Sequence, residues 1–196
     1  MKSIFLFIIL LFISCDSPEN KLPILSYTIN DIGVKEYYSI SYQGFKNQLG
    51  QSITTTQIEG KVIIANFFFT RCPSICPPMR TQLIEVANSI NHKDFLILSH
   101  TIDPKHDSTN VLKTYSDATG IPASKWQFLN ASETETKLLA KQYMTNFKPT
   151  KDGEDFYHSS FIALVDKSQQ IRGFYNILVA EEVKRLKTDI EILLKN

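Results

Sequence analysis

The sequence has no excess of charge of either sign, which argues against one large class of partner. Its 196 residues include 21 Lys plus Arg and 20 Asp plus Glu, for a formal net charge of +1. Proteins that bind nucleic acid usually carry a basic surface, because contacts with phosphates supply much of their affinity. We therefore expect no nucleic acid partner. Apolar residues make up 43% of the chain, enough for the hydrophobic core of one domain.

The sequence also lacks internal repeats, low-complexity blocks and long hydrophobic runs, apart from one stretch at the N-terminus. Residues 1–14 read MKSIFLFIILLFIS, in which one Lys precedes an apolar run too short for a membrane-spanning helix. This pattern predicts an export signal. Cys15 follows directly, as in the lipobox motif of bacterial lipoproteins, in which the cysteine after the signal is lipidated. Phe12 stands where the lipobox usually has Leu. An ordinary signal peptide cut nearby is the alternative.

The predicted organisation of the chain follows from that segment. We expect residues 1–14 to be a lipoprotein signal peptide, residues 15–36 a lipidated tether, and residues 37–196 the folded domain. The protein would then be exported and anchored through Cys15 to a membrane of a bacterial cell envelope, facing the periplasm.

Apolar strand-like segments alternate with amphipathic helical segments through the rest of the chain. Residues 62–69 form a continuous apolar run, typical of a strand buried on both faces, and prolines mark the first turn of the helix that follows. Ser108 is the expected N-cap of a later helix, and Ser132 with Glu135 forms a capping box. This order predicts a thioredoxin-like α/β fold, a central mixed β-sheet flanked by helices, with an N-terminal β-hairpin. We expect strands at 37–42, 45–54, 62–69, 94–101, 126–129, 161–165 and 171–175, and helices at 76–90, 108–119, 132–144 and 180–194.

The chain has few cysteines, so any redox or metal chemistry that depends on thiols is confined to a few positions. There are three, so lipidation of Cys15 leaves Cys72 and Cys76 as the redox-active or metal-binding pair. The two cysteines are four residues apart at the start of a predicted helix, so they lie on the same face of it. At that end of a helix, the free backbone N–H groups and the helix dipole stabilise the thiolate relative to the thiol. Arg71 acts in the same direction. Two thiolates suit Cu(I), which needs only one further nitrogen or sulfur ligand.

His158 is the expected third ligand. It precedes the predicted strand 161–165, and if that strand runs antiparallel beside 62–69, its start lies at the edge that carries the cysteines. His100, which ends another strand at the same edge, is the reserve ligand; the other two histidines lie in polar stretches.

Two structural roles for the cysteine pair are alternatives to a copper site. A disulfide between Cys72 and Cys76 would close so short a loop that it would stabilise the fold by only about 2 kcal/mol. A structural zinc would need a fourth ligand, for which only His100 or Asp103 is close. Asp103 and Asp107 follow the strand that ends at His100, where they could orient a ligand or dock a partner; roles in a turn and a helix cap are the alternative.

Together these segments resemble the Sco family, also called SenC or PrrC, whose members are membrane-tethered copper chaperones with a thioredoxin fold. The residues that carry the resemblance are 60–62, 67–77, 103–104, Asp107 and 158–159. The resemblance implies that Cys72, Cys76 and His158 bind copper, as Cu(I) or Cu(II). It also implies delivery of copper to the CuA centre in subunit II of cytochrome c oxidase, or to another copper enzyme, or reduction of the CuA cysteines. Many relatives keep a transmembrane helix where this chain has Cys15.

Two functions from different classes remain open on these residues. The first is a metallochaperone that passes copper on by ligand exchange. The second is a thiol-disulfide oxidoreductase in which copper is incidental, although the usual redox motif spaces its cysteines three apart rather than four. A thiol peroxidase is a weaker third, because nothing else marks a peroxide site.

Overall fold

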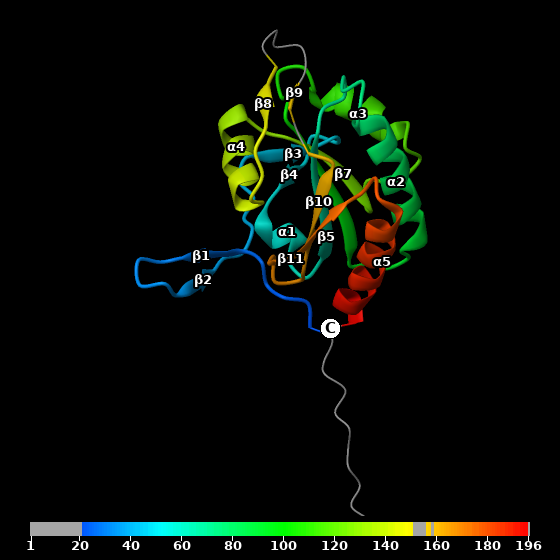
Figure 1. Ribbon diagram of the computed structural model, residues 1–196. Coiled ribbons are helices and arrows are strands. Elements are labelled where there is room, and N and C mark those ends of the chain that lie inside the picture. Colours follow the sequence, from blue (N-terminus) through cyan, green and yellow to red (C-terminus); the bar gives the residue numbers. More distant parts are fainter. Residues whose placement is uncertain (1–20, 151–155, 158, 196) are drawn as a thin grey trace, which may run out of the picture.

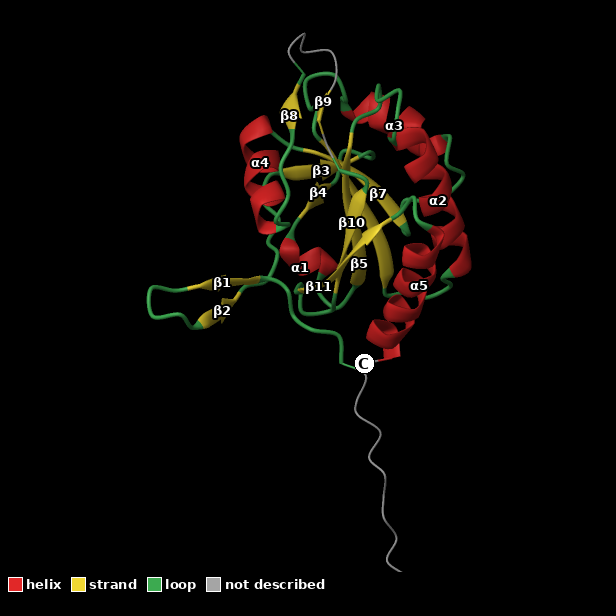
Figure 2. Ribbon diagram, viewed as in Figure 1, coloured by secondary structure: helices red, strands yellow, loops and turns green. Residues whose placement is uncertain are grey.

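A seven-stranded mixed sheet forms the centre of the molecule, with helices on both of its faces (Figures 1 and 2). The computed structural model describes residues 21–150, 156, 157 and 159–195. The strand order is β11-β10-β5-β6-β7-β3-β4, in which β5, β6 and β7 are parallel and the remaining pairs are antiparallel. Two small two-stranded sheets, β1-β2 and β8-β9, lie outside it.

The bounds of the elements are as follows. The strands are β1 Tyr27–Ile29, β2 Lys35–Tyr37, β3 Phe45–Asn47, β4 Ser52–Ile53, β5 Val62–Phe68, β6 Phe95–Thr101, β7 Trp126–Asn130, β8 Lys148–Pro149, β9 Phe156–Tyr157, β10 Phe161–Val165 and β11 Ile171–Asn176. The helices are α1 Thr55–Ile58, α2 Cys76–Ser89, α3 Thr109–Asp117, α4 Glu133–Gln142 and α5 Ala180–Lys195.

The sheet separates two hydrophobic cores. On one face α2, α3 and α5 pack through Leu83, Leu112 and Leu186, and on the other face α1 and α4 pack through Ile58 and Leu139. Because both faces are covered, β5 is apolar along nearly its whole length, as its sequence predicts. The predicted mixed sheet with flanking helices is confirmed.

The predicted N-terminal hairpin is present, but with different strands. The hairpin is formed by β3 and β4, both inside the predicted range 45–54, and it adds to the sheet edge at β7. The predicted strand 37–42 is wrong apart from Tyr37, which ends β2. The apolar side chains that suggested it, Ile40 and Tyr42, are buried in a loop whose backbone N–H groups donate to Gln169 and the Thr55 hydroxyl.

The predicted helix caps are confirmed, and one helix is shorter than expected. The Ser108 side chain accepts from the Val111 N–H, and Ser132 and Glu135 form a reciprocal capping box. The helix predicted to reach residue 144 ends at Gln142, because Met144 has a φ of +51° and so cannot continue a right-handed helix.

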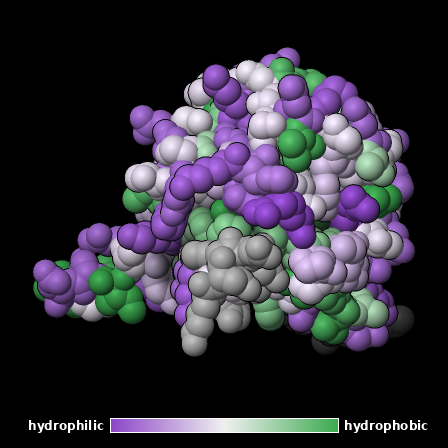
Figure 3. All heavy atoms as spheres, turned by 90° about the horizontal axis from the view of Figure 1, so that it is seen from above, coloured by the Kyte–Doolittle hydropathy of each residue, from purple (hydrophilic) through white to green (hydrophobic). Residues whose placement is uncertain are grey.

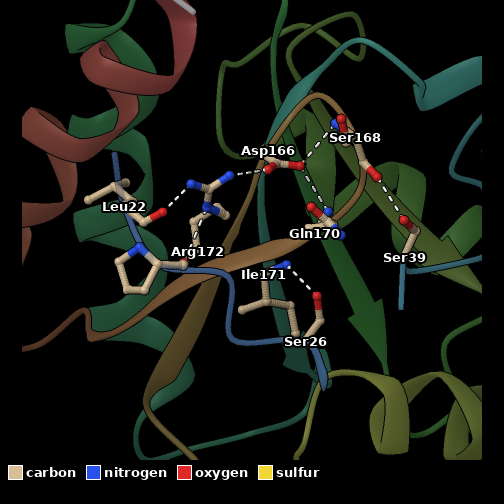
Figure 4. A network of polar contacts seen from close by, with 9 residues as sticks. Leu22, Ser26, Ser39, Asp166, Ser168, Gln170, Ile171 and Arg172 are labelled. Atoms are coloured by element: carbon tan, nitrogen blue, oxygen red, sulfur yellow. Dashed lines mark hydrogen bonds and ion pairs between the residues drawn. The ribbon is translucent and has the colours of Figure 1, made fainter. Parts of the chain in front are cut away.

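Part of the predicted tether packs against the domain. The Ser26 side chain is fully buried and its hydroxyl accepts from the Ile171 N–H at 3.2 Å. The Arg172 guanidinium bridges the Asp166 carboxylate and the backbone carbonyl of Leu22 (Figure 4). Residues 22–26 therefore form a strap along β11, at the turn that joins it to β10.

No helix among the described residues is long and apolar enough to cross a membrane. The predicted signal peptide and Cys15 lie outside the described residues.

Candidate metal centre

The two cysteines lie where the central strand passes into a helix. β5 ends at Phe68, and Cys76 is the first residue of α2, with Pro77 and Pro78 in its first turn. Proline suits these positions, because it has no N–H and the first backbone N–H groups of a helix have no partner within it. The sequence therefore fixes the start of the helix, and with it the position of Cys76.

Cys72 accepts a hydrogen bond at the N-terminus of α2. The N-cap residue, Ile75, has no side-chain acceptor, and the Cys76 N–H donates instead to the Cys72 sulfur at 3.4 Å. The Ser74 hydroxyl lies 3.8 Å from the same sulfur. Both cysteines are buried, with 6% and 3% of their surface exposed, and they are not joined in a disulfide.

This environment favours the thiolate of Cys72. Burial raises the pKa of the thiol, but hydrogen bonds from the backbone and side chains of Cys76 and Ser74 together lower the pKa below its ordinary value. The thiolate is the form that binds a soft metal or attacks a disulfide. The geometry places the Cys72 sulfur at the start of the helix whose first residue is Cys76.

His158 itself lies outside the described residues, so its distance from the sulfurs stays a prediction. The topological step behind that prediction is confirmed, since β10 pairs antiparallel with β5 and follows residue 158 by three positions. On the other side of residue 158, the Phe156 ring packs edge-on against Phe69 with centroids 5.1 Å apart. Phe69 is three residues before Cys72, so the segment just before His158 packs beside the cysteine loop.

His100, the reserve ligand, is not at the site. It is fully buried on the opposite face of the sheet, where its ring contacts Tyr42, Phe67 and Tyr143. Its Nδ1 lies 3.0 Å from the Asn66 carbonyl oxygen and its Nε2 3.0 Å from the Tyr42 hydroxyl. Both ring nitrogens therefore have partners in the core. The described residues include no group of three or more His, Cys, Asp or Glu side chains able to hold a metal.

The other predicted site residues hold the cysteine loop in place. Arg71 forms an ion pair with Asp103, with 2.6 Å between Nη2 and Oδ2. The fully buried Asp107 carboxylate accepts from the Thr70 N–H at 3.0 Å, and from the Thr70 and Thr101 hydroxyls at 2.5 Å each. These contacts connect the loop to the end of β6.

Sequence reasoning missed two residues beside Cys76. Arg80 lies one helical turn further along α2, and its guanidinium stacks 4.9 Å from the centre of the Tyr115 ring. Burial raises the pKa of Tyr115 to about 12; Arg80 opposes the rise, and the negative charges of Cys76 and Cys72 add to it. The i, i+4 spacing of Arg80 from Cys76 could have identified the first residue, whereas only the fold brings Tyr115 there.

The fold and the loop together define a thioredoxin-like protein with a dithiol at the start of its first long helix. The comparisons with known proteins agree. The family model described as SCO1/SenC matches residues 35–194, and the chain therefore belongs to this family.

The relatives are moderately similar in sequence. The SCO1 protein homolog of Bacillus subtilis is 28% identical over 143 residues, covering 71% of this chain and 74% of the relative. The crystal structure of yeast Sco1 with copper bound has a TM-score of 0.63 and 26% identity, covering 79% of this chain and 90% of that one.

Two further solved structures share the fold at lower identity. A SCO1/SenC family lipoprotein from Bacillus anthracis has a TM-score of 0.73 and 21% identity, covering 87% of this chain and 96% of that one. BsSco, described as a member of the Sco family of cytochrome c oxidase assembly proteins, has a TM-score of 0.72 and 22% identity, covering 89% of this chain and 98% of that one.

Proposed function

We propose that this chain is a copper chaperone that binds one copper ion through Cys72, Cys76 and His158. Its recipient would be the CuA centre in subunit II of cytochrome c oxidase, or another copper enzyme. We further propose that a lipid on Cys15 anchors it to a bacterial membrane, with the domain in the periplasm.

The observation that carries this proposal is the pair of sulfurs at the N-terminus of α2. They are buried, adjacent and not bridged, and hydrogen bonds favour the thiolate of Cys72. Two thiolates and an imidazole form a donor set that Cu(I) accepts at low coordination number. The yeast Sco1 structure, which has copper bound, supports copper as the metal. The B. anthracis relative is a lipoprotein, which supports the anchor, and BsSco is a member of a family of cytochrome c oxidase assembly proteins, which supports the link to the oxidase.

The chain's own residues would hold the cargo and release it stepwise. The two sulfurs are supported by α2 and by the contacts of Asp103 and Asp107, whereas His158 comes from a distant part of the sequence. A recipient with its own soft ligands can then replace one donor at a time, so that copper is never released into water.

A thiol-disulfide oxidoreductase is the second candidate, and the low pKa of Cys72 favours it. The Cys72 thiolate would attack a disulfide of the recipient, forming a mixed disulfide and releasing one recipient thiolate. The Cys76 thiolate would then attack the Cys72 sulfur, which forms the Cys72–Cys76 disulfide and releases the second thiolate. The recipient gains two electrons and this chain loses two.

Titration of the reduced, detergent-solubilised chain with Cu(I) and Cu(II) distinguishes the two functions. For a chaperone we expect tight one-to-one binding that is lost in Cys72→Ser and Cys76→Ser and strongly weakened in His158→Ala. His106→Ala, at an exposed histidine, is the matched control and should bind as the parent does. Unchanged stoichiometry and affinity in His158→Ala would remove that residue from the ligand set. Weak copper binding together with a mildly reducing dithiol couple would favour the oxidoreductase.

A further inference from the structure

The hairpin of β1 and β2 projects from the body of the molecule and carries a concentration of exposed apolar side chains (Figures 1 and 3). Ile32 at its turn is 82% exposed, and Ile29, Val34 and Tyr37 are 53–65% exposed. Apolar side chains clustered on a protruding element usually mark a contact surface, because a monomer in water gains nothing by displaying them together.

The hairpin has two different faces. Cross-strand partners lie on the same face of a sheet, so the pairs Tyr27–Tyr37 and Ile29–Lys35 share one face and Thr28–Glu36 lies on the other. The first face thus combines two tyrosines, an isoleucine and a lysine. Apolar groups beside tyrosine and lysine are typical of elements at a lipid–water interface, where the aromatic ring and the long lysine stem span the boundary.

The shape of the hairpin is fixed by local contacts. The Asn30 carboxamide oxygen accepts from the N–H groups of Ile32 and Val34, which closes the turn. The rings of Tyr27 and Tyr37 pack edge-on with centroids 6.0 Å apart, and the Lys35 ammonium lies 4.2 Å from the centre of the Tyr27 ring. These contacts hold the apolar face in one arrangement.

The base of the hairpin is fixed to the end of the domain at which the described chain begins. The Leu25 N–H donates to Ile171, and the Tyr38 N–H donates to Ser26, so the strap and the segment after β2 hold both ends of the hairpin. This end carries the β10–β11 turn, which lies beside the start of β5, whereas the cysteine loop follows the end of β5. The hairpin and the cysteine loop are therefore at opposite ends of the sheet (Figure 1).

The length of chain before the hairpin limits its distance from a lipid on Cys15. Eleven residues lie between Cys15 and Tyr27, and even a fully extended chain of that length spans only about 40 Å. Such a tether keeps the hairpin at a high local concentration near the bilayer, so a contact that is weak alone would be occupied.

We infer that the β1–β2 hairpin rests on the lipid surface beside the anchor. Its turn residue Ile32 and the face formed by Tyr27, Ile29, Lys35 and Tyr37 would lie among the lipid headgroups. The inference depends on the proposed lipid on Cys15. The hairpin carries Asp31 and Glu36 besides Lys35, so apolar contact rather than charge holds it, and zwitterionic membranes suffice. As a consequence the cysteine loop faces away from the membrane, toward a recipient's soluble domain.

Quenching of a tryptophan by brominated lipid tests this contact. The full chain carrying Ile32→Trp, produced in a bacterial host that processes lipoproteins, is reconstituted in phosphatidylcholine vesicles with and without bromine on the acyl chains near the headgroup. The one native tryptophan, Trp126, is 1% exposed in the core and gives a constant background. Leu138→Trp, at a 55% exposed apolar position of α4, is the matched control. Ile29→Trp is a second probe on the hairpin, should Ile32→Trp disturb the turn.

We expect both hairpin variants to show blue-shifted emission that brominated lipid quenches, and the Leu138→Trp variant to show neither effect. If the chain floats with the vesicles but the hairpin probes are not quenched, the hairpin inference is wrong and the anchor stands. If the chain does not float, the anchor and the hairpin contact are both refuted, while copper titration still decides the chaperone function. A blue shift that needs no vesicles and grows with protein concentration would assign the face to a second copy of the chain.

Discussion

The buried His100 makes the stability of this protein depend on pH in a way that can be calculated. The Asn66 carbonyl can only accept a hydrogen bond, so Nδ1 carries the proton and Nε2 accepts from the Tyr42 hydroxyl. Tyr42 in turn lies 2.7 Å from the Tyr143 hydroxyl. Burial lowers the pKa of His100 from 6.5 to about 4, against a smaller opposing effect of the Asn66 hydrogen bond.

The sign and size of the effect follow from linkage. Because the pKa of His100 is lower in the folded state, the unfolded chain takes up the proton first as the pH falls. The stability is therefore complete above about pH 6.5 and is lost as the pH falls toward 4. A difference of about 2.5 pKa units corresponds to about 3 kcal/mol in total, of which about 2 kcal/mol is lost between roughly pH 7.5 and roughly pH 5.

Urea unfolding of the metal-free chain at these two pH values measures the effect. In His100→Gln the side chain has no proton to gain, so the loss of unfolding free energy between the two pH values should be smaller than in the parent by about 2 kcal/mol. His106→Gln, at an exposed histidine, should lose as much as the parent. If His100→Gln and the parent lose the same amount, His100 is not the buried neutral group that the structure describes.

Three further predictions concern the supports of the loop and of the strap. Asp107→Asn should lower the free energy of unfolding by about 2–3 kcal/mol in urea titration, because an amide cannot replace a carboxylate that accepts three hydrogen bonds. The control Asp117→Asn, at an exposed carboxylate, should change the free energy of unfolding by less than about 0.5 kcal/mol. Equal losses in the two variants would contradict this interpretation. Arg71→Gln should change the free energy of unfolding by less than about 1 kcal/mol, because the arginine is half exposed. The same variant should release copper faster than the parent in stopped-flow transfer to a chelator. An unchanged release rate would show that the ion pair of Arg71 with Asp103 does not support the site. Arg172→Gln should increase hydrogen exchange in residues 22–26 while leaving exchange in β5 unchanged, and unaltered exchange in the strap would show that the guanidinium does not hold it.

The parts of the fold that the sequence predicted well are those with strong local signals. The apolar run 62–69 is typical of a strand covered on both faces, and the prolines after Cys76 mark the start of α2 within a residue. Residues 37–42 have strand-like alternation, but their backbone N–H groups donate to the β10–β11 turn and to the first residue of α1 instead of a neighbouring strand. The strap was missed for a related reason, because the contacts that fix it come from β11, well over a hundred residues away. The β1–β2 hairpin is closed by local contacts of Asn30, but it lies within residues 15–36, which the sequence assigned to the tether.

The site shows the same division between local and distant information. Sequence reasoning placed Cys72, Cys76, Asp103 and Asp107 at one edge of the sheet from spacing and strand order, but it did not predict that the two carboxylates contact Arg71 and Thr70 of the loop. It placed His100 at that edge as well, but successive side chains of a strand point to opposite faces. The Ser99 hydroxyl donates to the Asn66 side chain, whereas the next residue, His100, packs into the other core. The order and direction of the strands predict the edge of the sheet at which a residue lies. The face of the sheet to which its side chain points depends on where the strand begins, which no sequence motif here specifies.

The hydrogen bonds that hold the cysteine loop have a consequence for copper transfer. Asp107 holds the cysteine loop through Thr70 and Thr101, and none of these contacts involves the β9–β10 segment that contains His158. The histidine can therefore leave the metal without loss of these contacts, and the two sulfurs remain in place to pass the ion on. For this reason His158→Ala should weaken copper binding while the metal-free chain unfolds at the same urea concentration as the parent. A matching loss of stability would mean that the histidine braces the loop, and stepwise transfer from a fixed dithiol would then no longer follow from the structure.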